Sequence, residues 1–265
     1  MSEITLSNLS QMKQRGERIA VLTAYDASLA RILDEAGVEV ILVGDSLGMV
    51  IQGRESTLPV DVDDMVYHTQ CVVRGRRRAL LVADMPFMSY GSPEQALHNA
   101  GRLMKEGGAH MVKLEGGAVQ LETVRRLTDH GIPVCAHLGL LPQSVYKLGG
   151  YRVQGRDEPT ARKLREDAEA LQAAGAQLLV LECVPSGLAQ EIAATLRIPV
   201  IGIGAGPGCD GQVLVLYDLL GITPGKAPSF ARNFLAGAGS VQAAVDAYVR
   251  AVKEGGFPAA GESFA

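Results

Sequence analysis

Two acidic residues of this chain end successive apolar runs, an arrangement that can place their carboxylates side by side. Asp45 ends the run EVILVGD, and Asp84 ends the run LLVAD. Neighbouring strands lie about 4.8 Å apart, so the two side chains are expected close together. Carboxylates that close repel each other unless one is protonated or a cation bridges them. A small set of hard oxygen ligands suits Mg²⁺; the alternative is that the two acids cap the helices that follow.

A lysine, a glutamate and a histidine end the next two apolar runs. Lys113 and Glu115 lie two apart in HMVKLE, so a strand turns both toward the same face. They can form a structural ion pair, or Lys113 can bind an anionic substrate group while Glu115 supports a metal directly or through water. His137 ends the run PVCAH, where it can donate a hydrogen bond to a carboxylate or be an ordinary core histidine.

Glu182 ends QLLVLE, a run whose other residues are mostly apolar. Apolar surroundings disfavour the charged carboxylate and raise its proton affinity, which suits a general base. The alternative is an acid that caps a helix starting near Ser186. A glycine-rich run at residues 202–211, GIGAGPGCDG, does not match the spacing of a phosphate-binding loop and indicates close backbone packing instead.

Eight apolar runs of this kind alternate with segments of helical periodicity. Runs of this length are typical of strands buried on both faces, as in a parallel sheet. Eight parallel strands with chemistry at their carboxyl ends predict an α/β fold, the (β/α)8 or TIM barrel. A further helix near residues 6–15 precedes the first run and is expected to plug the bottom of the barrel. The runs cover residues 19–26, 39–45, 80–84, 110–115, 133–137, 177–182, 199–206 and 213–218.

The length of 265 residues fits one such barrel, which takes about 250. We therefore predict a single domain over residues 1–265, with a C-terminal tail from about residue 255. Residues 138–158 form the longest stretch without clear periodicity. Because they follow a strand's carboxyl end, they are predicted to be an active-site lid.

Composition excludes several classes of protein. A net charge of −4 argues against nucleic-acid binding, which favours a clustered basic surface. No run approaches the ~20 apolar residues of a membrane span, and the N-terminus has no apolar signal region. The four cysteines lack metal-site spacing and are expected to be reduced thiols. These features predict a cytoplasmic protein that binds neither nucleic acid nor membrane.

Longer motifs give the chain a family resemblance. In order, it contains TAYD, ILVGDSLGMV, VADMPFMSYG, VKLEGG, AHLGLLPQSV, GGYRVQG, VLECVP and IGIGAG. Over roughly residues 4 to 235 it closely resembles the 3-methyl-2-oxobutanoate (ketopantoate) hydroxymethyltransferases. The chain departs from the family pattern at Ala136, where glycine often precedes the histidine. It also departs in the tail, where a histidine is expected between Glu262 and Ser263.

The resemblance implies an enzyme, a transferase of the TIM-barrel fold that acts in pantothenate biosynthesis. Members of the family transfer a hydroxymethyl group from 5,10-methylenetetrahydrofolate to 3-methyl-2-oxobutanoate through an enolate stabilised by Mg²⁺. The product is 2-dehydropantoate (ketopantoate), and the protein commonly assembles as a homodecamer.

The resemblance also implies roles for individual residues. Glu182 is implied as the proton acceptor. The implied Mg²⁺ ligands are Asp45, Asp84 and Glu115. The implied contacts to the keto acid are Asp45, Ser46, Asp84, Lys113 and His137.

Two other readings of the same residues are open. Lyases and mutases of the phosphoenolpyruvate mutase and isocitrate lyase type also hold a 2-oxo acid on Mg²⁺ in a barrel. They usually carry a reactive cysteine in a Lys-Lys-Cys-Gly loop, which this sequence lacks. An inactive barrel that serves as a binding protein is expected to have lost Asp45, Asp84 or Glu182, and all three are present.

Overall fold

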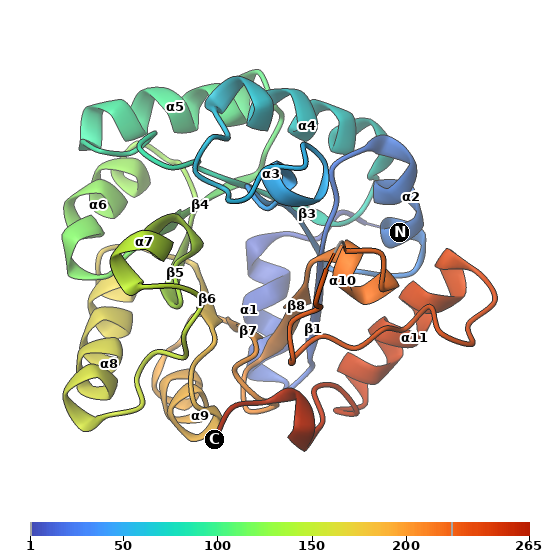
Figure 1. Ribbon diagram of the computed structural model, residues 1–265. Helices are drawn as coiled ribbons and strands as arrows, with labels where there is room; N and C mark the ends of the chain where they lie inside the picture. The colour runs from blue at the N-terminus through green and yellow to red at the C-terminus, as the bar shows by residue number, and fades with distance from the viewer. Residues whose placement is uncertain (1, 224) are drawn as a thin grey trace.

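Eight parallel strands close into a barrel in which each strand pairs with its neighbours in the sequence and β8 pairs with β1. The computed structural model describes residues 2–223 and 225–265 (Figure 1). This architecture confirms the predicted (β/α)8 barrel. The strands are β1 (Ile19–Thr23), β2 (Val40–Val43), β3 (Leu80–Asp84), β4 (Met111–Glu115), β5 (Val134–Gly139), β6 (Leu178–Glu182), β7 (Val200–Ile203) and β8 (Gly211–Leu214).

Long helices surround the barrel, and short ones lie in its connections (Figure 1). Among the described residues, no helix is both long and apolar enough to cross a membrane. The long helices are α2 (Ala27–Glu35), α4 (Val62–Gly75), α5 (Pro93–Lys105), α6 (Leu121–Asp129), α8 (Glu158–Ala173), α9 (Ser186–Thr195) and α11 (Val241–Lys253). The short ones are α3 (Leu47–Val50), α7 (Val145–Leu148) and α10 (Leu216–Leu220), with 3-10 turns at Ala118–Gln120, Pro142–Ser144 and Ala260–Glu262.

The strands are buried on both faces because the barrel has two apolar layers. Successive side chains of a strand point to opposite faces of the sheet. In β1, Val21 belongs to the cluster inside the barrel, whereas Ala20 and Leu22 belong to the cluster between strands and helices. The inner cluster is largely Val, Ile and Leu, which explains why the runs show no polar alternation in the sequence.

The helix α1 (Leu6–Gln14) closes the amino-terminal end of the barrel, as predicted. Its buried residues, Leu9 and Met12, belong to the same cluster as the inward-facing strand side chains. The side chain of Lys13 at the end of this helix reaches Asp210, just before β8, at 2.6 Å. The plug is therefore held by apolar packing inside and by an ion pair at its edge.

The last strand lies earlier in the sequence than predicted. We expected a strand over residues 213–218 ending at Asp218, but β8 ends at Leu214 and the chain then turns into α10. Asp218 lies in this helix, where its Oδ1 accepts a hydrogen bond from the Thr223 hydroxyl at 2.6 Å. The physical reason is spacing: three leucines are buried together on one helical turn, namely Leu216, Leu219 and Leu220.

The connection from β7 to β8 contains no helix and depends on close packing of its glycines. A Cβ built on Gly206 would lie 2.4 Å from the Ser186 Cβ, and one on Gly208 would lie 2.6 Å from the Gln190 Cβ. The connection therefore packs directly against the first turns of α9. This geometry agrees with the interpretation of the glycine-rich run as close backbone packing.

The plug helix predicts a stability effect. Leu9 is 1% exposed, so Leu9→Ala leaves a cavity and is expected to lower the free energy of unfolding by about 2–5 kcal/mol. Ser7→Ala, an exposed position of the same helix, should change it by less than about 0.5 kcal/mol. Urea denaturation of both variants checks this, and equal midpoints would contradict the assignment of α1 as a plug.

Candidate active site

The register of the barrel brings the predicted residues together at its carboxyl end. Asp84 on β3 is the register partner of Lys113 on β4, and Glu115 on β4 is the partner of His137 on β5. Glu182, the last residue of β6, pairs with Gly139 at the end of β5. Asp45 lies two residues beyond β2. Four neighbouring strands and the turn after β2 therefore supply the site.

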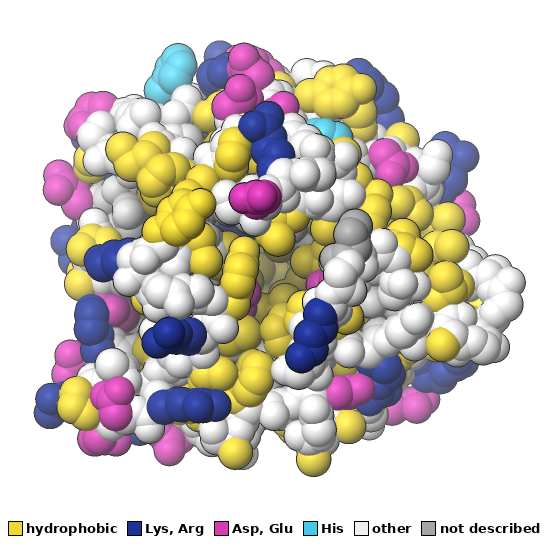
Figure 2. Space-filling view, in the orientation of Figure 1, with side chains coloured by type: hydrophobic (Ala, Val, Ile, Leu, Met, Phe, Trp, Pro, Cys, Tyr) yellow, Lys and Arg dark blue, Asp and Glu magenta, His cyan; other side chains and the backbone are white. Residues whose placement is uncertain are grey.

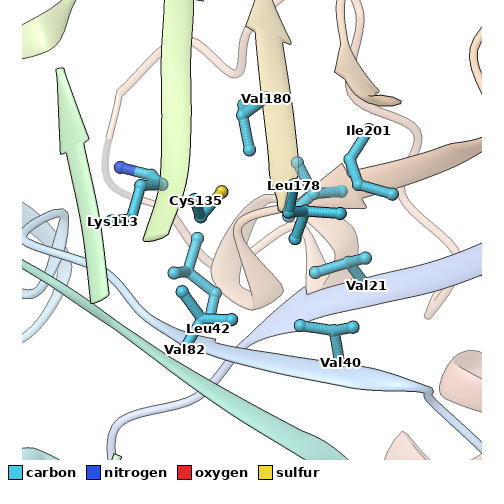
Figure 3. Close-up of a pocket in the computed structure, with 10 residues that line it drawn as sticks. Val21, Val40, Leu42, Val82, Lys113, Cys135, Leu178, Val180 and Ile201 are labelled. Carbon is cyan, nitrogen blue, oxygen red and sulfur yellow. The ribbon is translucent and has the colours of Figure 1, made fainter. Parts of the chain in front are cut away.

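Lys113 forms a buried ion pair with Asp84, with its Nζ 2.7 Å from Oδ1. Burial by itself lowers the pKa of Lys113, but the negative charges of Asp84 and two further carboxylates outweigh burial and raise it. The lysine stem lies at the edge of a small apolar cavity of about 10 Å³ inside the barrel. Figure 3 shows its nitrogen pointing away from the other lining residues, such as Cys135 and Val180.

Asp45 and Asp84 are adjacent and buried, at 4% and 3% exposure. The Asp45 backbone N–H donates to Asp84 Oδ2 at 3.1 Å. Neither acid caps a helix: α3 begins after Ser46, and α5 is capped by Ser92. Burial first, and then the charges of Asp84 and Glu115, raise the pKa of Asp45 to about 8. The two carboxylates therefore repel each other when both are ionised, and a bound cation lowers that repulsion.

The donor set fits Mg²⁺ with few protein ligands. Among the described residues, no three His, Cys, Asp or Glu side chains form a ready-made metal cluster. Glu115 has one oxygen, Oε2, bonded to the Gln143 N–H at 3.1 Å and the other, Oε1, facing His137. Mg²⁺ commonly takes one or two carboxylates and completes its shell with water and substrate, which matches Asp45 and Asp84.

His137 lies between two carboxylates and is 2% exposed. Its Nδ1 is 3.4 Å from Glu115 Oε1, and its Nε2 is 3.2 Å from Glu182 Oε2. Each ring nitrogen therefore faces a carboxylate oxygen at the long end of hydrogen-bond distance. Burial and the charge of Lys113 lower the pKa of His137, but the contacts with the two glutamates raise it to about 9. An imidazolium therefore links Glu115 to Glu182.

Glu182 is the most exposed acid of the site, with 15% of its side chain accessible. It does not cap α9, whose N-cap is Pro185 with no side-chain bond. Gly139 has a φ of +93°, and a Cβ built there would lie 2.2 Å from the Glu182 backbone oxygen. Only glycine allows the ends of β5 and β6 to approach this closely.

Three polar residues of the site were missed in the sequence. Tyr25 is fully buried and lies 2.8 Å from the Ser46 Oγ, hydroxyl to hydroxyl. Tyr90 donates to the side-chain oxygen of Gln143, whose own amide donates to Asp45 Oδ2 at 2.9 Å. Tyr25 and Tyr90 follow β1 and β3 in loops, and Gln143 lies in the 3-10 turn after β5. The one available signal was that they occur in the motifs TAYD, VADMPFMSYG and AHLGLLPQSV.

The loop after β5 and the C-terminal tail flank the site. Tyr151 of this loop donates to Met49 Sδ at 3.7 Å, across from the turn after β2. In the tail, the Phe264 backbone oxygen accepts from the Ser186 N–H at 2.9 Å, and its ring meets Phe230 edge to face. Figure 2 shows the resulting hollow, with hydrophobic side chains around it.

The fold and the site together define a (β/α)8-barrel enzyme with a buried cluster of carboxylates, lysine and histidine at the carboxyl end of its strands. The model of the ketopantoate hydroxymethyltransferase family matches residues 3–260, and the chain belongs to this family.

Curated relatives agree with this family, and solved structures share the fold. The 3-methyl-2-oxobutanoate hydroxymethyltransferase of Nitrosococcus oceani is 63% identical over 97% of this chain and 98% of its own length. That of Thiobacillus denitrificans is 64% identical over 98% and 99%. A phosphonomutase-like structure from Burkholderia cenocepacia matches with a TM-score of 0.61 at 16% identity, covering 82% of this chain and 95% of that one. A phosphonopyruvate hydrolase solved with oxalate and Mg²⁺ matches at 0.61 and 10%, covering 81% of each. These two structures show the fold alone.

The raised pKa of Asp45 predicts a pH dependence of stability. Its pKa is about 8 in the folded protein against 3.8 ordinarily, so between these values the folded state binds more protons than the unfolded state. Stability from this group is therefore lost as pH rises. In EDTA, the unfolding free energy of the wild type should fall more steeply between about pH 5 and pH 8 than that of Asp45→Asn, which cannot titrate. Parallel slopes in urea denaturation would contradict this.

Proposed function

We propose that this chain transfers a hydroxymethyl group from 5,10-methylenetetrahydrofolate to 3-methyl-2-oxobutanoate, which forms ketopantoate. Membership of the family supports the reaction. The structural observation that carries the proposal is that two groups of acids meet at one end of the barrel. Asp45 and Asp84 are adjacent there. Beside them, His137 lies between Glu115 and Glu182. We infer from this arrangement a cation-binding pair and a candidate base around one hollow.

Asp45 and Asp84 would hold Mg²⁺, with Glu115 supporting it through water or by direct contact. When bound, the ion supplies Lewis-acid chemistry, which withdraws charge from the oxygens of a 2-oxo acid and favours loss of the C3 proton. The buried charge of Lys113, fixed by its contact with Asp84, supplies positive potential for the substrate's anionic groups. The Ser46 hydroxyl, held by Tyr25, adds a polar contact beside them.

Glu182 would accept the C3 proton of the keto acid. It is the site's most accessible carboxylate, whereas Asp84 is held by Lys113 and Glu115 by a loop amide. His137 contacts Glu182 and keeps its carboxylate oriented. The carbon that has lost its proton would then attack the methylene group of the donor, and the first of that group's two C–N bonds breaks. Water would displace the second nitrogen and supply the hydroxyl. The two released nitrogens take up the proton held by Glu182 and one from water, so that the donor leaves as tetrahydrofolate.

The lyase and mutase reading gains no support from the structural neighbours. Their identity to this chain is 10–18%, so they share its barrel and carry no argument about its reaction. Assembly as a decamer and a cytoplasmic location stay predictions from the sequence.

A first test is the loss of the proposed base. Glu182→Gln keeps the shape of the side chain but cannot accept a proton, so we expect turnover to fall by about 10²–10⁴-fold with substrate binding retained. Proton NMR of 3-methyl-2-oxobutanoate in D₂O with Mg²⁺ should show exchange of the C3 proton with the wild type and not with Glu182→Gln. Glu166→Gln, an exposed glutamate on α8, is the matched control. A near-normal exchange rate in Glu182→Gln would remove it as the base.

A second test separates the metal role of Asp84 from its structural role. Asp84→Asn leaves Lys113 buried without its counter-charge, which should cost about 3–5 kcal/mol of unfolding free energy. The double variant Asp84→Asn with Lys113→Met removes both charges and should recover most of that stability. Mg²⁺-dependent proton exchange should stay lost in both. Activity in the double variant would contradict the proposed roles of this pair.

A further inference from the structure

Gln143 is a buried amide of the loop after β5 that bonds to both parts of the site. Its Nε2 donates to Asp45 Oδ2 at 2.9 Å and to the Met85 backbone oxygen at 3.0 Å. Its backbone N–H donates to Glu115 Oε2 at 3.1 Å. The residue is 6% exposed, so these bonds are formed away from solvent. One loop residue thus holds two carboxylates from different strands.

The orientation of the Gln143 amide is determined by its partners. Its Oε1 accepts from the Tyr90 hydroxyl, and both hydrogens of its Nε2 meet acceptors. A flipped amide would direct its NH₂ group at the Tyr90 hydroxyl and its oxygen at the Asp45 carboxylate, which repels it. The Tyr90 hydroxyl in turn accepts from the Glu115 backbone N–H at 3.4 Å. The amide therefore has one stable arrangement.

These hydrogen bonds show which carboxylate oxygens of the site are already engaged. Gln143 donates to Asp45 Oδ2 and to Glu115 Oε2, and the Asp45 backbone N–H donates to Asp84 Oδ2. Asp45 Oδ1 accepts no hydrogen bond from the residues that the structure describes and is left for a cation. Glu115 Oε1 is left to face His137.

The same residue anchors the loop. Among the described residues, the hydrogen bonds from residues 141–153 to parts of the protein outside the loop come from Gln143 and from Tyr151, whose hydroxyl donates weakly to Met49 Sδ. The ends of the loop are held by backbone bonds, from the Leu140 N–H to the Glu182 oxygen and from the Gln154 N–H to the Cys183 oxygen. The other bonds of this stretch, such as Gly150 N–H to the Val145 oxygen, are internal to it. Tyr151 is 57% exposed, so its contact is the weaker of the two. Loss of the Gln143 side chain therefore removes the bonds with Asp45, Met85 and Tyr90 that hold the middle of the loop, and leaves the backbone bond to Glu115.

We propose that Gln143 is a positioning residue that couples docking of residues 141–153 to the geometry of the cation site. The inference rests on the proposed function, because it takes Asp45 and Asp84 as the cation ligands. In this coupling the docked loop orients Asp45 and Glu115, and the two carboxylates in return hold the loop over the hollow. The loop is then part of the metal-binding structure as well as a cover.

The test uses Mn²⁺ alone as a probe, with no substrate. Gln143→Met keeps the size of the side chain but removes its donors. Its Kd for Mn²⁺, measured by electron paramagnetic resonance, should rise by about tenfold or more over the wild type. Hydrogen–deuterium exchange of amides 145–152 should also become faster. Gln154→Met is the matched control, because the Gln154 side chain bonds only to the Arg152 backbone oxygen in the same loop.

A purely structural role for Gln143 would lower thermal stability and leave the Mn²⁺ affinity within about twofold of the wild type, which would overturn the proposal. Tyr90→Phe gives a second, milder variant if Gln143→Met does not fold, because it removes only the donor to Gln143 Oε1. It too should weaken Mn²⁺ binding, and unchanged affinity there would overturn the proposal. Absence of saturable Mn²⁺ binding to the wild type would instead overturn the metal assignment, and this inference with it.

Discussion

The structure depends on burying four carboxylates and two cationic side chains together at one end of a closed apolar barrel. A buried ion is costly unless an opposite charge and hydrogen bonds compensate for it. Lys113 compensates Asp84 at 2.7 Å, and His137 lies between Glu115 and Glu182. Among the described residues, the Gln143 amide alone donates a hydrogen bond to the Asp45 side chain, and burial with the charges of Asp84 and Glu115 raises the pKa of Asp45 to about 8. Asp45 is thus the least compensated carboxyl of the site, and a cation is expected to favour its ionised form.

The barrel imposes this arrangement through its register and its apolar interior. Parallel pairing sets Asp84 beside Lys113 and Glu115 beside His137, so charge complementarity is built into adjacent strands. Below them the inner cluster of Val, Ile and Leu side chains excludes water and strengthens each electrostatic contact. The plug α1 completes this exclusion from the opposite end. Core packing and site electrostatics therefore depend on the same strands.

The loops complete the site by providing neutral hydrogen-bonding groups. Tyr25 holds Ser46 after β2, and Tyr90 holds the Gln143 amide that meets Asp45. Neutral donors orient carboxylates without adding a charge that must be compensated. Most of the ionisable groups of the site thus come from the strands, and the neutral groups that orient their side chains come from the loops. A loop that docks through such contacts links access to the hollow with the arrangement of its acids.

The barrel, and the five ionisable site residues at or just after its strand ends, could be predicted from the amino-acid sequence. Apolar runs indicate burial on both faces, and an acid that ends such a run is visible without a structure. Which acids pair with which cations, that β8 ends before Asp218, and that Gln143 enters the site became visible in the folded barrel. The hydrogen bond from Gln143 to Asp45 joins residues 98 positions apart. Contacts of that separation leave no local periodicity, because they form only when the barrel closes and brings its loops together.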